Sequence, residues 1–96
     1  MKITQQLEKY QTENVQICKI FAERFRDLRR IRRLTLRCIA IKLGISRQSI
    51  VYYAMGDRIP SIPILISIAA LLNTSVDYLL GLTDNKTPQT PPIKRG

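Results

Sequence analysis

The sequence predicts an all-α protein: a five-helix domain with an N-terminal helical extension and a disordered, proline-rich C-terminal tail. Apolar residues recur at three- and four-residue steps, which is the period of a helix that buries one face. Glycine and proline are absent before Gly44 and then fall between the periodic segments, where they mark turns. Residues 83–92 lack periodicity and hold three of the five prolines, a pattern typical of a flexible segment. We therefore expect an extension at residues 1–16, a domain at 17–82 and a flexible tail at 83–96.

The N-terminal segment carries one long apolar stripe. Ile3, Leu7 and Tyr10 continue this stripe upstream in heptad register. The pattern leaves open whether residues 4–31 form one helix or two with a break near 12–14. A stripe of this length exceeds what a small core covers, so it also favours packing on a second subunit. Its central members are Ile17, Ile20, Phe21, Phe25, Leu28 and Ile31.

Two short helices joined by a glycine turn follow. Thr35 is a suitable N-cap for a helix over about 35–43, and Gly44 supplies the left-handed residue that ends it. Ser46 then caps a helix over 47–54. This succession predicts a helix-turn-helix joint.

The last part of the domain contains two further predicted helices. Gly56 and Pro60 interrupt the periodic pattern, which indicates a loop over 55–61. The apolar spacing then predicts a helix over 63–73 and a short one over 76–80.

Positive charge is concentrated in one part of the chain. The sequence has 16 Lys and Arg against 7 Asp and Glu, a net charge of +9. Within residues 24–37, seven arginines are opposed by one acidic residue, Asp27. Such a cluster attracts polyanions, and the planar guanidinium suits phosphate better than a lysine ammonium does. A solvated helix face is the alternative, but the density of arginine favours contact with nucleic acid.

The composition gives no support to catalysis or to a bound metal. The chain has no histidine, and the spacing of Cys18 and Cys38 resembles no zinc pattern. We expect no catalytic residue, no metal and no cofactor, with both cysteines as free thiols. No apolar run approaches the roughly 18 residues of a membrane span, and residues 1–11 lack the apolar stretch of a secretory signal. The expected location is therefore the cytoplasm, without contact to a membrane.

Five stretches of the sequence match a known family pattern in order. They are RFRDLR at 24–29, LT at 34–35, IAIKLGISRQSI at 39–50, GDRIPS at 56–61 and LLNTSVDYLLGLT at 71–83. Residues 24–82 thus resemble the helix-turn-helix domain of the lambdoid-repressor and Cro family, also called Xre-like regulators. The resemblance implies a compact five-helix repressor-like domain that docks its third helix, about 46–54, in the major groove of double-stranded DNA. It also implies a homodimer on a two-fold operator.

Three residues match the base-reading positions of that family: Arg47, Gln48 and Tyr52. Arg47 can bind the O6 and N7 atoms of guanine, and Gln48 can pair with N6 and N7 of adenine. Tyr52, one helical turn later, can reach a thymine methyl group or a phosphate. The alternative is that these side chains are merely solvated. It is less favoured because the third helix of such a joint seldom lacks a binding partner.

A second group of residues is expected to contact the DNA backbone. Small hydroxyls, arginines and an accessible glycine amide suit phosphate contacts that set the register of the protein on DNA. The expected residues are Arg32, Arg33, Arg37, Ser46, Ser49, Gly56 and Arg58.

The chain departs from the family pattern at several positions. Leu36 replaces a glutamine, Arg33 replaces a turn glycine, and Ala54 replaces a glutamate that pairs with the arginine at the position of Arg29. An unpaired buried arginine is costly. We therefore expect Arg29 to bind Asp57 or a carbonyl, or to turn to solvent.

The sequence favours a sequence-specific DNA-binding transcriptional regulator. The alternative is a protein-interaction module on the same scaffold, such as an antitoxin or antirepressor, with a protein partner and weak DNA binding. Apolar residues at positions that the family commonly fills with polar groups keep this alternative open, as core residues or as a partner surface. They are Ile41, Val51, Ile64, Ile66 and Ala70.

Overall fold

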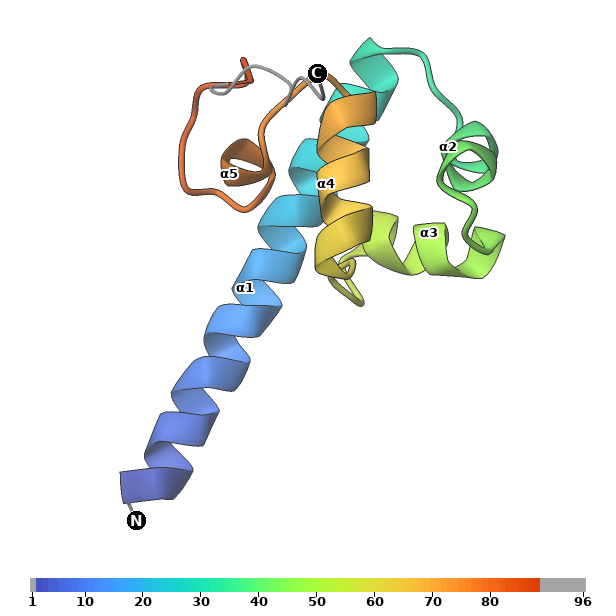
Figure 1. Cartoon of the computed structure of the whole chain (residues 1–96). Helices are drawn as coiled ribbons and strands as arrows, with labels where there is room; N and C mark the ends of the chain where they lie inside the picture. Colours follow the sequence, from blue (N-terminus) through green and yellow to red (C-terminus); the bar gives the residue numbers. More distant parts are fainter. Residues whose placement is uncertain (1, 89–96) are drawn as a thin grey trace, which may run out of the picture.

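A computed structural model of the chain describes residues 2–88, with side chains described for residues 15–88. These residues form five helices and no strand: α1 (Lys2–Ile31), α2 (Leu36–Leu43), α3 (Arg47–Met55), α4 (Ile62–Leu71) and α5 (Val76–Leu79) (Figure 1). The predicted all-α class is confirmed. None of the helices in this part of the chain combines the length and the apolar character that a membrane crossing requires.

Helix α1 is one continuous helix of 30 residues, so the break near residues 12–14 does not form. At 1.5 Å per residue it is about 45 Å long, and its N-terminal half projects away from the other helices (Figure 1). Its C-terminal half packs against α3 and α5. The rings of Phe21 and Phe25 stack at 5.6 Å in the core. Ile31, by contrast, is 63% exposed, so within residues 15–31 the apolar stripe is buried only from Phe21 to Leu28.

The capping residues predicted for α2 and α3 are confirmed. Thr35 and Ser46 have extended backbones, and their hydroxyls accept hydrogen bonds from the amides of Cys38 and Ser49, each at 3.0 Å. Gly44 ends α2 with a φ of 66°, a left-handed conformation that glycine adopts without a steric penalty. These local interactions set the angle between the two helices.

Helix α4 begins and ends slightly earlier than predicted. It spans Ile62–Leu71 rather than 63–73, with Pro63 in its first turn, where the missing amide proton costs nothing. The chain turns out of the helix at Asn73, which has a φ of 53°. Ser75 then caps α5 by accepting a hydrogen bond from the amide of Tyr78 at 3.0 Å.

The core is formed by one apolar face of each helix. Leu36, Val51 and Ile64 pack against it, so Leu36 replaces a polar family residue by a core contact. Ile41, Ile66 and Ala70 remain exposed. The buried cluster comprises Phe21, Phe25, Leu28, Ile39, Ala40, Ile50, Ala54, Leu65, Ile68, Ala69, Leu72, Tyr78 and Leu79.

The segment after α5 folds back on the domain. The buried hydroxyl of Thr74 donates to the carbonyl of Lys86 at 2.6 Å, and Arg24 donates to the carbonyl of Thr83 at 2.6 Å. Residues 83–88 are therefore anchored at two points. The rest of the predicted tail lies outside the described residues.

Candidate nucleic-acid interface

Helix α3 divides into a buried face and an outer face. Ile50 and Ala54 are buried, whereas Arg47 and Gln48 in the first turn are exposed. The glycine turn fixes α3 on α2, and α1 packs against the end of α3 through Cys18, Ala22 and Arg26. The outer face of α3 is thus held in a fixed position by the rest of the domain, and a binding surface that must match the shape of its partner requires this.

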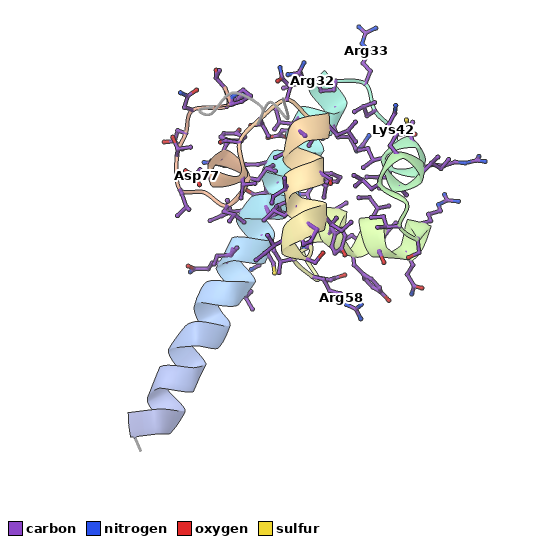
Figure 2. The ribbon with its side chains drawn as sticks, viewed as in Figure 1. Arg32, Arg33, Lys42, Arg58 and Asp77 are labelled. Atoms are coloured by element: carbon purple, nitrogen blue, oxygen red, sulfur yellow. The ribbon has the colours of Figure 1, made fainter. Side chains whose placement is uncertain are left out.

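Basic residues dominate the charge around these helices, and the exposed Asp57 directly follows the cap of α3. Residues 28–56 contain seven Lys and Arg and no Asp or Glu, and this segment includes α2, α3 and the turns around α2. Asp77 lies on α5, on the opposite side of the domain from α2 and α3 (Figure 2). The surface near α3 therefore has a positive potential that favours a polyanion.

Four exposed arginines surround this surface: Arg33, Arg37, Arg47 and Arg58. Among the described residues, none of their guanidinium groups forms a hydrogen bond or an ion pair. Arg33 precedes α2 and Arg58 follows α3, and the two lie at opposite ends of the helix-turn-helix unit (Figure 2). Guanidinium groups placed in this way are available to phosphates on either side of a groove.

Tyr52 is in contact with both Gln48 and Arg58. The Nε2 atom of Gln48 donates a hydrogen bond of 2.7 Å to the Tyr52 hydroxyl. The Cζ atom of Arg58 lies 4.5 Å from the centroid of the Tyr52 ring. Two predicted base readers and one predicted backbone contact are thus brought together.

The hydroxyls of Ser46 and Ser49 are engaged in the start of α3. The Ser46 hydroxyl donates to that of Ser49 at 2.8 Å and accepts from the Ser49 amide. Both groups lie at the N-terminus of α3, where the helix dipole favours an anion. These hydrogen bonds show that both residues take part in capping α3.

Gly56 is placed against α1. Its φ is 82°, and a Cβ atom there would lie 3.4 Å from the Cys18 carbonyl oxygen and 3.5 Å from the Ala22 Cβ. Its amide donates to the Tyr53 carbonyl at 3.3 Å. A glycine is favoured here because the backbone is left-handed at the end of α3 and because α1 approaches its Cα atom closely.

Arg32 is separated from the other predicted backbone contacts. Its Nε atom donates to the carbonyl of Leu72 at 3.2 Å, so it caps the end of α4. In Figure 2 it lies near the upper end of α4, away from α3. The structure does not bring Arg32 together with Arg47 and Arg58.

Three further arginines of the dense segment bind backbone carbonyls. Arg26 donates to Ala54 at 2.5 Å and Arg29 to Leu34 at 3.1 Å, which confirms the expected carbonyl partner for Arg29. The Nε atom of Arg29 is buried without a partner. Arg24 donates to the Tyr78 carbonyl at 2.6 Å and lies 4.2 Å above the Tyr78 ring. These side chains stabilise the domain.

The sequence reasoning missed one exposed cation of this surface. Lys42 lies on α2 within the segment that lacks acidic residues (Figure 2). The sequence signal was the extent of that segment, which continues past Arg37 to Gly56. No group of three or more metal-ligating side chains occurs in the described part of the chain.

Two adjoining helices, a glycine turn and an exposed, positively charged second helix define a helix-turn-helix protein. The family model described as Helix-turn-helix matches residues 25–79, more than half of the chain. The chain belongs to the helix-turn-helix family. No solved structure gives a significant match.

Two curated relatives are similar to this chain. The uncharacterized HTH-type transcriptional regulator YobD of Bacillus subtilis (strain 168) is 37% identical over 70 residues, which are 73% of this chain and 62% of YobD. The uncharacterized HTH-type transcriptional regulator YqaE of the same organism is 39% identical over 61 residues, which are 64% of this chain and 53% of YqaE. The matched region thus spans less than two thirds of either relative.

Proposed function

We propose that this protein is a sequence-specific DNA-binding transcriptional regulator that inserts α3, together with Ser46, into the major groove. The observation that carries this proposal is the outer face of α3, which presents Arg47 and Gln48 within a segment of seven basic and no acidic residues. The family and the names of both relatives support the same function. Both relatives are bacterial proteins, and a DNA-binding regulator of a bacterium acts in the cytoplasm. The proposed location of this protein is therefore the cytoplasm.

The proposed contacts divide by chemistry. Arg47 and Gln48 carry donor and acceptor groups that match guanine and adenine edges in the major groove. Arg33, Arg37 and Arg58 would neutralise phosphates on either side, with Arg37 in the first turn of α2. The hydroxyls of Ser46 and Ser49 would approach a phosphate at the start of α3, and Lys42 would add to the field.

A homodimer through the outer face of α4 is part of the proposal. Residues 59–76 contain no charged side chain, and Ile62 and Ile66 are 72% and 56% exposed one helical turn apart. Two copies of a chain with a net charge of +9 repel, so they associate most readily through an uncharged face. A two-fold contact would place one α3 on each half-site of a symmetric operator.

Sedimentation across a dilution series tests the dimer. We expect a mass that falls with dilution, and a monomer at all concentrations for Ile66→Asp. A wild-type protein that is monomeric at every concentration would remove this part of the proposal and leave DNA binding untouched.

Selection from random oligonucleotides at about 0.15 M salt, near physiological ionic strength, tests the function itself. We expect one enriched motif, and loss of one base preference in Gln48→Ala. Absence of any enriched motif, together with weak and salt-sensitive DNA binding, would instead support a protein-interaction module.

A further inference from the structure

Gln48, Tyr52 and Arg58 form a chain of contacts that runs from the loop after α3 to the outer face of α3. Gln48 and Tyr52 are four residues apart, so they neighbour each other on the helix. The 2.7 Å hydrogen bond joins their side chains, and the guanidinium of Arg58 covers the ring at 4.5 Å. Tyr52 is half-buried, whereas Gln48 and Arg58 are exposed.

These contacts restrict two side chains that would otherwise sample many rotamers. An exposed glutamine loses substantial conformational entropy when it binds a base edge. The hydrogen bond to Tyr52 orders Gln48 before DNA arrives. A guanidinium stacked on a ring keeps its N–H groups at its edge, where they remain available to a phosphate.

The orientation of the Gln48 amide has a consequence for base choice. One Nε2 hydrogen is used by the Tyr52 hydroxyl, which leaves Oε1 and the second Nε2 hydrogen. An acceptor beside a donor is the complement of adenine, which offers the N6 donor and the N7 acceptor. Guanine offers two acceptors at O6 and N7 and pairs with Gln48 only if the amide turns over, so that Oε1 accepts from the Tyr52 hydroxyl and both Nε2 hydrogens are left for the base.

We propose that Tyr52 and Arg58 are positioning residues that hold the Gln48 side chain toward one base pair, and that Arg58 links this base contact to a phosphate contact. The amide orientation in the structure is the complement of adenine. This inference rests on the proposed function. It gives Tyr52 a role through Gln48 instead of direct contact with a base. It also makes Arg58 unlike Arg33 and Arg37, the other arginines proposed to bind phosphates, because it acts on both affinity and base preference.

Tyr52→Phe is the sharpest test, because it removes the hydroxyl and keeps the ring under Arg58. We expect an unchanged melting temperature and a loss of affinity for the selected motif of about five- to tenfold, at the lower end of the range for a bidentate contact to a base. Base preference should be lost at a single base pair. This pair should be the one at which Gln48→Ala also loses its base preference. In the Gln48→Ala background, Tyr52→Phe should have no further effect.

Arg58→Ala and Arg37→Ala form a matched pair of charge removals. Both variants should weaken binding to all sequences, since each loses one phosphate contact. Arg58→Ala should in addition flatten the preference at the base pair read by Gln48, and Arg37→Ala should leave every preference intact. Arg58→Ala tests the inference independently if Tyr52→Phe alters the fold.

The outcomes separate this inference from the function on which it rests. A wild-type protein that enriches no motif would remove both. If the wild-type protein selects a motif, and Tyr52→Phe and Arg58→Ala select the same motif with the same base preferences, the positioning role is wrong. The proposal of DNA binding would stand.

Discussion

Two groups of arginines on this domain have the same chemistry and opposite uses. Arg24, Arg26 and Arg29 on α1 donate to backbone carbonyls of the domain. Arg37 and Arg47 on α2 and α3 are exposed, and no described residue accepts a hydrogen bond from their guanidinium groups. The density of arginine is therefore no measure of the proposed phosphate-binding surface. The geometry of nearby carbonyl groups decides which guanidinium is available to a partner.

The physical reason lies in the ends of the helices. The last carbonyls of a helix have no partner within it, and α3, α4 and α5 end beside α1 and the residue that follows it. Arg26 binds the Ala54 carbonyl at the end of α3, and Arg32 binds the Leu72 carbonyl after α4. A cation at a helix C-terminus is also favoured by the helix dipole. Arg26 and Arg32 thus bind carbonyls at the ends of α3 and α4, and Arg24 adds a second donor to the Tyr78 carbonyl, which also accepts from the Gly81 amide.

The largest expected effect is the loss of stability in Arg24→Ala. Arg24 donates to the Tyr78 and Thr83 carbonyls and stacks on the Tyr78 ring. Since hydrogen bonds from a charged group contribute about 1.5–3 kcal/mol, we expect the free energy of unfolding to fall by about 2–3 kcal/mol. The ion pair with Asp84 adds little, because that side chain is 99% exposed.

Urea denaturation measures this change, and Arg30→Ala is the control. Arg30 is exposed on the same helix, and its removal should alter stability by at most about 0.5 kcal/mol. Equal effects of the two substitutions would mean that the contrast between bound and exposed arginines has no energetic basis.

Arg47→Ala should show the reverse behaviour. We expect a loss of about 1–3 kcal/mol against the preferred operator, since a bidentate contact to guanine is removed. The free energy of unfolding should stay the same. Titrations of operator and of unrelated DNA measure the difference, with Arg30→Ala as a variant of equal charge; a loss of equal size on both DNAs would remove Arg47 from the base-reading set.

Arg37→Ala should have a smaller effect that depends on salt and not on sequence. Neutralising one phosphate releases about one counterion, so the slope of log K against log salt should become shallower by about 1. Affinity measured at several salt concentrations gives this slope. An unchanged slope would show that Arg37 remains solvated in the complex.

The smallest expected effect is at Arg33, which stands where the family has a turn glycine. Its φ of 57° is costly for a residue with a side chain, so Arg33→Gly should raise the free energy of unfolding by about 0.5 kcal/mol after the gain in unfolded-state entropy. Affinity for DNA should fall modestly through the lost charge.

Asn73→Gly separates these two effects. Asn73 has a φ of 53° and carries no charge, so its replacement should change stability slightly and DNA binding not at all. Melting curves and DNA titrations of both variants measure this. An Arg33→Gly protein with full affinity for DNA would show that this arginine has no phosphate partner.

Local chemistry accounts for the elements that were predicted well. Thr35, Ser46 and Ser75 cap helices through their own hydroxyls, and Gly44 and Gly56 end helices with a positive φ. Each of these interactions spans only a few residues, so it can be read from the sequence. The positions of the two helices and of the turn that carry the candidate site were predictable from the sequence for the same reason.

The sequence by itself determined the helical class, the caps, the glycine turn and the identity of α3 as the exposed second helix of the joint. The tertiary structure decided the continuity of α1, the exposure of Ile31, the carbonyl partners of Arg24 and Arg26, and the contact of Arg58 with Tyr52. The first group depends on backbone preferences within one or two helical turns. The second depends on which carbonyl or ring, as much as 59 positions away in the chain, the fold brings near a long side chain, as for Arg24 and the Thr83 carbonyl.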